Sequence, residues 1–324
     1  MYLTPSALYY VPKSPPPELV EQLLPSGKMH VITVLDCTNA SDPGGSLSAV
    51  YGTGNPSYLL VQCYPPNSSS QQGILVDVKT GARWTLWTDG QESADGWYGG
   101  GAWVYGGWVY FTTYTVPYGH GLVQRAMNLA TGATKPAASP LAQYVASYRA
   151  PDGTLYGMKW SSPASEDSVD LYRLYGPFES TLIAKNLPVD SGQGILSMLT
   201  IDANGTIWVP RQGGTLTPSA GAMTIRLAKP TPAPPKSKVI MTGIGYVVCL
   251  GSLPNPYAES PIQVTVATPH GTKTITVGHT PDVQDDFGAV PYTLNGNPQV
   301  TLAVYFPAPV GRWQIVTVSR GSSS

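Results

Sequence analysis

Apolar positions along the chain alternate within short runs, and these runs come in pairs. Five times between Ala7 and Leu227 an apolar run is followed by a second one, which begins 14 to 22 residues after the start of the first. Such short alternating runs, separated by glycine-containing turns, predict β-strands. The outgoing strands are Ala7–Val11, Tyr58–Tyr64, Trp108–Tyr114, Leu155–Trp160 and Ile207–Arg211, and the return strands start near Met29, Ile74, Leu122, Val169 and Met223.

The spacing of the pairs predicts the architecture. One pair follows the next after about fifty residues, a period typical of propeller blades. Residues 1–228 are therefore predicted to form a five-bladed β-propeller in an all-β chain. A helix of one or two turns is expected only after Pro15–Pro17, where Glu18 suits a helix start and Leu19, Val20, Leu23 and Leu24 form an apolar face.

Four segments carry a resemblance to known propellers. Ile74–Leu86 and Met127–Lys135 each contain a strand, a Thr-Gly turn and a second strand, and they resemble hairpins of propellers related to quinoprotein repeats. Arg149–Met158 and Thr200–Pro210 resemble the aspartate-turn-glycine entry to an outgoing blade strand. The resemblance implies the fold and no particular chemistry.

A different pattern follows Leu227. Lys229–Lys238 is rich in proline and basic residues, which predicts an extended linker over residues 229–238. Residues 239–324 are predicted to form a separate domain of seven short strands. These strands are expected near Ile240, Tyr246, Ile262, Thr274, Ala289, Val300 and Ile315.

The last part of the chain also resembles a known domain class. Pro261–Phe306 is similar to immunoglobulin-like domains of bacterial and archaeal surface proteins, which implies a β-sandwich over 239–324. The resemblance depends on Gly271, Asp285, Asp286, Phe287, Gly288 and Tyr305. The alternative is a single seven-bladed propeller, with Tyr246–Leu250 and Ile262–Ala267 in a sixth blade and Val300–Phe306 and Trp313–Val318 in a seventh.

The composition is poor in charge and rich in Gly, Pro, Ser, Thr and Tyr. Charged residues make up 11% of the chain and the formal net charge is −1, against about 25% charged residues in typical domains. No basic field is present to attract a nucleic acid, so no nucleic-acid partner is expected. The sequence shows no secretory signal pattern and no apolar run long enough to span a membrane.

Catalytic and metal-binding patterns are weak throughout. Asp36, Asp77, Glu166, Asp170 and Asp202 are the candidate acids of a glycosidase, but they fall in predicted return strands and turns rather than converging on one channel mouth. The histidines are dispersed, and no cofactor or metal is expected. Cys37, Cys63 and Cys249 are expected to be buried thiols, with at most one intramolecular disulfide among them.

The most unusual segment runs from Gly96 to Gly121, where aromatic residues alternate with glycines. Alternation places Trp103 and Tyr105 on one face of a strand. These rings are expected either to fill the space between neighbouring blades or to form an aromatic platform for a sugar or a protein partner. The candidate binding residues are Trp97, Tyr98, Trp103, Tyr105, Trp108 and Tyr110.

Low charge, β-only modules and no export signal favour a non-enzymatic structural component of a virus particle. It would act in a tail, nozzle or attachment assembly, through contacts with other virion proteins, with copies of itself and with a host surface glycan or receptor. Its location would be the virion, with the extracellular space or a cell surface as the alternative. High proline content suits a thermophilic host. The alternative function is a carbohydrate-binding or glycoside-cleaving surface propeller.

Overall fold

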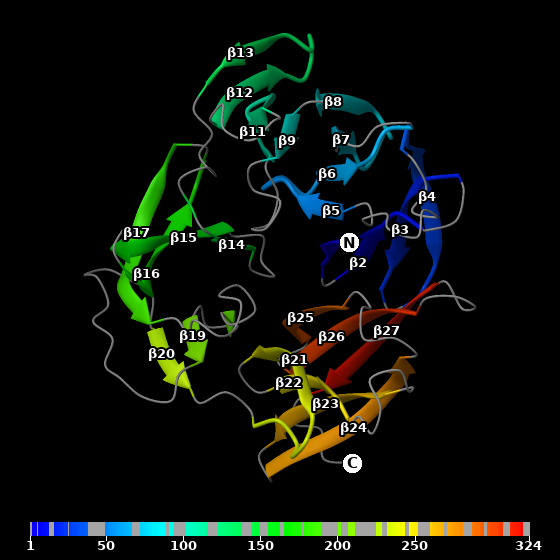
Figure 1. Cartoon of the computed structure of the whole chain (residues 1–324), viewed down its shortest axis with the longest axis vertical. Helices are drawn as coiled ribbons and strands as arrows, with labels where there is room; N and C mark the ends of the chain where they lie inside the picture. The colour runs from blue at the N-terminus through cyan, green and yellow to red at the C-terminus, as the bar shows by residue number, and fades with distance from the viewer. Residues whose placement is uncertain are drawn as a thin grey trace. The chain divides into compact units, whose positions relative to one another are not determined.

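The protein is all-β throughout the part of the chain that the structure describes. The computed structural model contains strands and turns over this part, and the strands form seven sheets (Figure 1). The described residues are 2–4, 6–12, 16–24, 26–37, 49–66, 72–88, 91–93, 102–115, 122–137, 144, 146–149, 155–162, 165–176, 178–188, 200–201, 207–210, 225–228, 232–243, 246–251, 260–268, 271–280, 287–294, 297–306 and 312–319.

The chain divides into two compact units. Unit 1 contains Met1–Lys159 and Tyr172–Thr181, and unit 2 contains Trp160–Leu171 and Leu182–Ser324. This division does not fall at the Pro-rich segment, so the domain boundaries 1–228, 229–238 and 239–324 stay a prediction. The segment itself is not extended throughout, because the Ser237 hydroxyl donates to the Pro234 carbonyl across a turn in which Lys236 has a φ of +62°.

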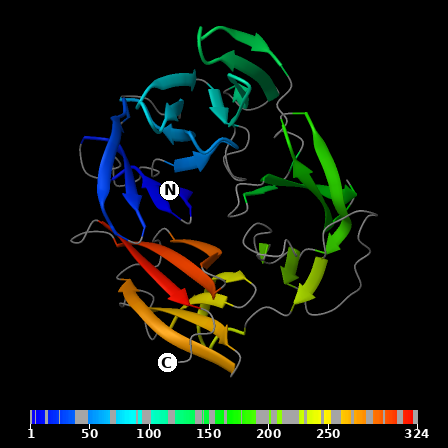
Figure 2. The same ribbon diagram turned by 180° about the vertical axis from the view of Figure 1, so that it is seen from behind.

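Sheets 1 and 2 each contain four antiparallel strands in chain order (Figure 2). Sheet 1 consists of β1 (Tyr2–Leu3), β2 (Ala7–Tyr10), β3 (Glu18–Leu23) and β4 (Met29–Val34). Sheet 2 consists of β5 (Ala49–Gly52), β6 (Tyr58–Cys63), β7 (Gln72–Asp77) and β8 (Arg83–Trp87).

Sheets 3 and 4 repeat this order. Sheet 3 consists of β10 (Ala102–Tyr105), β11 (Trp108–Thr115), β12 (Leu122–Asn128) and β13 (Thr134–Pro136), with β9 (Gln91–Ser93) also paired to β11. Sheet 4 consists of β14 (Ala146–Arg149), β15 (Leu155–Ser162), β16 (Ser165–Leu174) and β17 (Ser180–Pro188).

Sheet 5 is smaller, with β18 (Thr200–Ile201), β19 (Ile207–Pro210) and β20 (Ile225–Ala228). Of the five predicted strand pairs, those in sheets 2, 3, 4 and 5 are neighbours in the structure. The pair in sheet 5 is parallel, however, whereas a simple return strand would be antiparallel. In sheet 1 the return strand predicted to pair with β2 is β4. In the structure β2 pairs with β3 instead, and β4 pairs with the other edge of β3.

The helix predicted after Pro15–Pro17 is wrong. These residues precede β3, which pairs with β2 on one side and with β4 on the other. Leu19 and Val20 are both buried, as expected for an inner strand covered on both faces. A short apolar run of this kind fits a doubly covered strand as well as a helix, so its periodicity alone could not distinguish the two.

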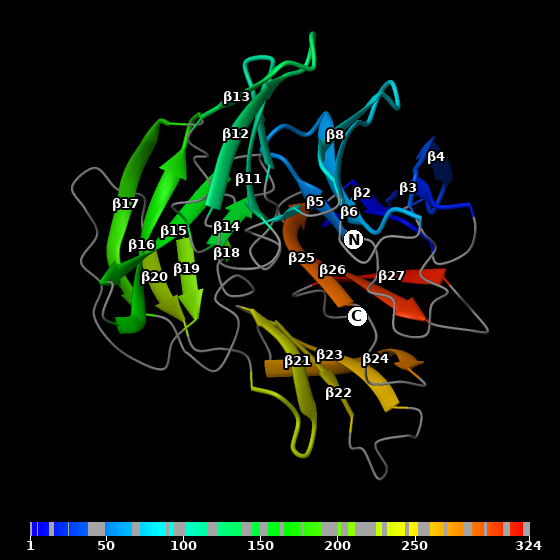
Figure 3. The same ribbon diagram turned by 45° about the horizontal axis from the view of Figure 1, so that its top comes forward.

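All seven strands predicted after the Pro-rich segment are present, in two sheets (Figure 3). Sheet 6 consists of β21 (Lys238–Gly243), β22 (Tyr246–Leu250), β23 (Ser260–Thr268) and β24 (Gly271–Thr280). Sheet 7 consists of β25 (Phe287–Leu294), β26 (Asn297–Phe306) and β27 (Arg312–Ser319). Both sheets follow chain order, whereas an immunoglobulin sandwich places its strands in a crossed order. The sandwich is therefore not confirmed.

Consecutive sheets of unit 1 share apolar cores. Residues of sheets 1 and 2 form one cluster, among them Leu19, Leu59 and Val61. Sheets 2 and 3 form a second, in which Trp87 contacts Phe111. Burial of these cores is the main stabilising term of the unit, because it removes large aliphatic and aromatic surfaces from water.

Cys37 and Cys63 form a disulfide, with Cα atoms 5.8 Å apart. The bond joins the segment after β4 to the end of β6, and both half-cystines lie in the core between sheets 1 and 2. The expectation of free buried thiols at these two positions is therefore wrong. It holds for Cys249, which is free and buried.

Candidate functional site

The β10–β11 hairpin places four aromatic residues on one face of sheet 3. Gly106 and Gly107 have φ of +56° and +79°, the positive values that a two-residue type I′ turn requires. The turn sets Tyr105 opposite Trp108 and Trp103 opposite Tyr110. Directly opposed residues of an antiparallel pair share a face, so the predicted alignment of Trp103 with Tyr105 extends to Trp108 and Tyr110.

Trp103 lies at the buried end of this face. Only 4% of its surface is exposed, and it clusters with Tyr144 and Leu174. Gly54 makes room for it, since a Cβ on Gly54 would lie 2.7 Å from Cδ1 of the indole. Trp103 therefore fills the space between neighbouring sheets, the packing role considered for these aromatic residues.

The other end of the face is open to solvent. Tyr105 is 48% exposed, while Trp108 and Tyr110 are half-buried. The β16–β17 turn adds Tyr175 and Phe178, which are 51% and 60% exposed. We call Tyr105, Trp108, Tyr110, Tyr175 and Phe178 the aromatic patch.

Direct contacts join the two parts of the patch. Phe178 meets Tyr110 edge to face, with ring centroids 5.5 Å apart. Gly176 lies against Tyr105, because a Cβ on it would be 3.4 Å from the phenol ring. The Tyr175 amide donates to the Glu179 carbonyl at 2.9 Å and closes the turn. The patch is thus built from residues far apart in the sequence.

Two cations lie over rings of the patch. Lys135 Nζ is 4.2 Å from the ring centroid of Trp108, and Arg173 Cζ is 5.0 Å from that of Tyr175. Over the described ranges, neither forms an ion pair with a carboxylate. Contacts of this kind stabilise a cation over a ring by about 0.5–1 kcal/mol at exposed sites.

The structure brings together part of the predicted site. Tyr105, Trp108 and Tyr110 belong to the patch, Trp103 is buried beside it, and Trp97 and Tyr98 lie outside the described residues. Tyr175 and Phe178 were missed. The sequence Tyr175-Gly-Pro-Phe178 combines turn residues with two aromatics between strands, which could have indicated an exposed aromatic turn.

The described candidate acids have structural roles. Asp77 Oδ1 accepts the amides of Lys79 and Thr80 at 2.8 and 3.0 Å. Asn128 does the same for Ala130 and Thr131 in sheet 3, so the position serves a repeated turn rather than catalysis.

The other candidate acids are Asp36, Glu166, Asp170 and Asp202. Asp170 accepts the Ser161 hydroxyl at 2.6 Å and the Asn186 amide at 3.0 Å. Asp36 accepts a bond from Gln72 only through its backbone carbonyl. The side chain of Glu166 and all of Asp202 lie outside the described residues.

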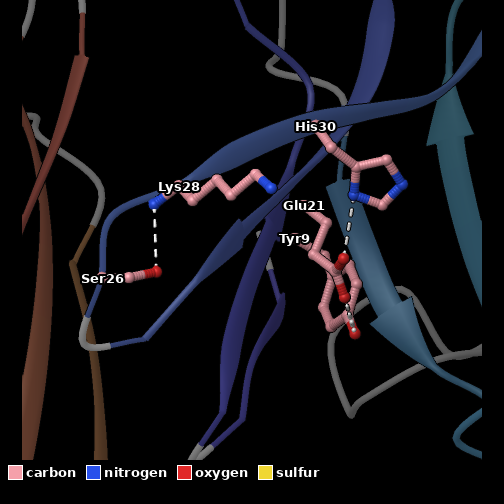
Figure 4. A network of polar contacts seen from close by, with 5 residues as sticks. All are labelled: Tyr9, Glu21, Ser26, Lys28 and His30. Atoms are coloured by element: carbon pink, nitrogen blue, oxygen red, sulfur yellow. Dashed lines mark hydrogen bonds and ion pairs between the residues drawn. The ribbon is translucent and has the colours of Figure 1, made fainter.

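A polar row crosses sheet 1 (Figure 4). Glu21 accepts the Tyr9 hydroxyl at 2.8 Å and pairs with His30 Nδ1 at 2.9 Å. Burial first, and then the Glu21 hydrogen bond, raise the pKa of the Tyr9 hydroxyl above its ordinary value, which keeps it protonated as a donor. Tyr9, Glu21 and His30 lie directly opposite one another on the adjacent strands β2, β3 and β4. This row of three side chains contains no serine or cysteine nucleophile.

The described ranges contain neither a metal-binding cluster nor a membrane-spanning helix. No group of three His, Cys, Asp or Glu side chains is placed there to hold a metal ion. None of these residues belongs to a helix that is long and apolar enough to cross a membrane.

No family model matches the sequence, and no curated protein matches it. Solved structures are similar at low identity. One is a protein assigned as a 6-phosphogluconolactonase of Bacteroides fragilis, at 12% identity and a TM-score of 0.40, over 99% of this chain and 97% of that one. Another is a mutant of AofleA from Arthrobotrys oligospora, at 12% identity and a TM-score of 0.36, over 94% and 81%.

A prolyl endopeptidase is also similar, at 11% identity and a TM-score of 0.37. The similarity covers 100% of this chain, which spans half the length of that protein, since only 50% of it is matched. At such identities and scores, these similarities carry no argument about function.

Proposed function

We propose that this protein binds carbohydrate through the aromatic patch. One observation carries the proposal: rings from sheet 3 and from the β16–β17 turn are gathered into one cluster that remains open to solvent. Clusters of exposed aromatic surface in soluble proteins mark interaction sites.

A sugar suits this surface better than a purely apolar ligand. The C–H face of a sugar ring packs on an aromatic face, while its hydroxyls stay in contact with water or with nearby polar groups. Tyrosine combines an apolar ring with a polar tip, and Tyr105 and Tyr175 present both at the surface. The patch therefore offers stacking surfaces without requiring a deep pocket.

The proposed activity is binding without catalysis. A glycosidase of the usual kind needs two carboxyl groups within about 5–10 Å of each other on either side of the scissile bond. Asp77 and Asp170 are engaged in turn and loop hydrogen bonds. Glycoside cleavage remains the enzymatic alternative, and release of reducing ends from a bound oligosaccharide would establish it.

Substituting Tyr105 with alanine is expected to weaken glycan binding at least tenfold, because it removes a stacking contact that contributes about 1.4 kcal/mol to the free energy of binding. The variant should still fold, because the Tyr105 ring is exposed. A glycan array first identifies the ligand, and titration calorimetry then compares wild type, Tyr105→Ala and Phe178→Ala. Leu23→Ala is the control, because Leu23 is a 39% exposed hydrophobic residue at the end of β3, on a different sheet. A wild-type protein that bound no glycan would overturn the proposal.

A second candidate is a structural role in an assembly such as a virus particle. The edge strand β4 favours it, because Met29 and Val31 share a face and are 61% and 47% exposed. We propose a second copy of this chain as the partner, since the near-neutral net charge of −1 gives little repulsion between copies.

Val31→Lys is expected to convert such an assembly to monomers, because a lysine on an edge strand opposes association. Light scattering after size exclusion should then show the 34.3 kDa monomer for the variant and a larger species for wild type. Val31→Ile serves as the control that keeps the surface apolar. A monomeric wild type would remove this candidate and leave the carbohydrate proposal untouched.

We also propose that the seven sheets are the seven blades of one propeller. Support comes from the strand order, since every sheet has its strands in chain order apart from the extra strand β9. The parallel pair β19–β20 is the exception to the antiparallel pattern of the other sheets. This interpretation replaces the sandwich with sixth and seventh blades, the alternative considered from the sequence.

A further inference from the structure

We infer that the saccharide recognised by the aromatic patch is an anionic one, carrying a carboxylate or a sulfate group. The inference rests on the proposed carbohydrate function and specifies its ligand class. Its basis is the pair of cations, Lys135 and Arg173, that border the exposed rings.

The cations and rings form a continuous row. Lys135 lies over Trp108, and Trp108 is directly opposite Tyr105 in the β10–β11 hairpin. Tyr105 in turn lies against Gly176, the neighbour of Tyr175, and Arg173 lies over the Tyr175 ring. A cation therefore lies over Trp108, the cross-strand neighbour of Tyr105, and another lies over Tyr175, which adjoins Gly176 in the turn against Tyr105.

Tyr105 is the ring best placed for stacking. It is 48% exposed, whereas Trp108 is partly covered by Lys135, and Tyr110 by Phe178. Over the described ranges, Tyr105 has no ring partner of its own. A sugar ring on Tyr105 would keep its substituents within the field of both cations.

Both cations retain donors for a ligand. A contact with a ring face leaves the three ammonium protons of lysine and the planar donor fork of arginine able to bind an oxyanion. In the described part of the chain no carboxylate neutralises either group by an ion pair. Glu179 lies on the same turn, and its contact with Tyr175 is through its backbone carbonyl.

This local excess of positive charge stands out in a nearly neutral chain. The whole sequence has 18 basic and 19 acidic residues. Hydrogen bonds between ionised partners are roughly twice as strong as neutral ones, so cations over the two neighbouring rings favour an acidic sugar over its neutral counterpart.

The test compares a galacturonate trisaccharide with its methyl ester, which keeps the rings and removes the charge. Sulfated and unsulfated galactose trisaccharides form the second pair and show which anionic group is preferred. We expect wild type to bind one anionic member about tenfold more tightly than its neutral partner, and the preference to shrink as salt screens the charges.

Lys135→Gln is expected to remove most of that preference, with about a tenfold loss for the anionic probe and little change for the neutral one. Lys79→Gln is the control, because Lys79 is an exposed lysine in the β7–β8 turn of sheet 2, outside the patch. Equal binding of charged and neutral probes, or an unaffected Lys135→Gln, would overturn the anionic inference while leaving carbohydrate binding intact. Absence of binding to any saccharide would overturn both.

Discussion

Substituting Trp87 with alanine is expected to lower the free energy of unfolding by about 3–5 kcal/mol, the range for large buried aromatics. Trp87 is 2% exposed and lies in the core between sheets 2 and 3. Its ring centroid is 6.2 Å from that of Phe111. Removing the indole is expected to leave a cavity, because packed strands relax only partially around a deleted side chain.

The local backbone is fitted to this indole. A Cβ on Gly73 would lie 2.3 Å from the Trp87 ring, so a glycine is required where β7 passes beneath it. The indole Nε1 has no hydrogen-bond partner among the described residues. The loss is therefore expected to come from packing alone, with no polar group left unsatisfied by the substitution.

Urea unfolding followed by circular dichroism measures the effect. Phe178→Ala is the control, because its ring is exposed and its removal is expected to cost no more than about 1 kcal/mol, through the lost edge-to-face contact with Tyr110. The unfolding midpoint should fall much further for Trp87→Ala than for Phe178→Ala. An unchanged midpoint in both variants would show that sheets 2 and 3 do not share the core described.

Strand positions were predictable because strands depend on local patterns. The seven strands after residue 237 were each located from alternation and turn residues. The Thr-Gly turns were also identifiable: Gly81 and Gly132 both have positive φ, and Asp77 and Asn128 cap equivalent loops. In both cases the determining residues lie close together in sequence.

Features that depend on distant contacts were not predictable in the same way. The apolar run at Leu19 and Val20 fitted a helix until its neighbours β2 and β4 were known. The aromatic hairpin was recognised from sequence, but its association with Tyr175 and Phe178 depends on how sheet 3 packs against the β16–β17 turn. Such packing leaves no local pattern in the sequence.

Removing the Cys37–Cys63 disulfide is expected to lower the free energy of unfolding by about 3–4 kcal/mol. The cysteines are 26 residues apart, and closing a loop of that length restricts the unfolded chain by about this amount in the loop-entropy account. The double variant Cys37→Ala/Cys63→Ala removes the bond without leaving a lone thiol in the core. Urea unfolding of wild type and variant measures the difference.

Two measurements make this prediction specific to the disulfide. Thiol titration of the unfolded, unreduced chain should find one free thiol, that of Cys249, whereas three would contradict the bond. The stability difference should also largely disappear when wild type is unfolded and refolded in reductant. Disulfides persist mainly in oxidising surroundings, so an intact bond in the native protein would favour the extracellular or virion surface at which a carbohydrate ligand would be met.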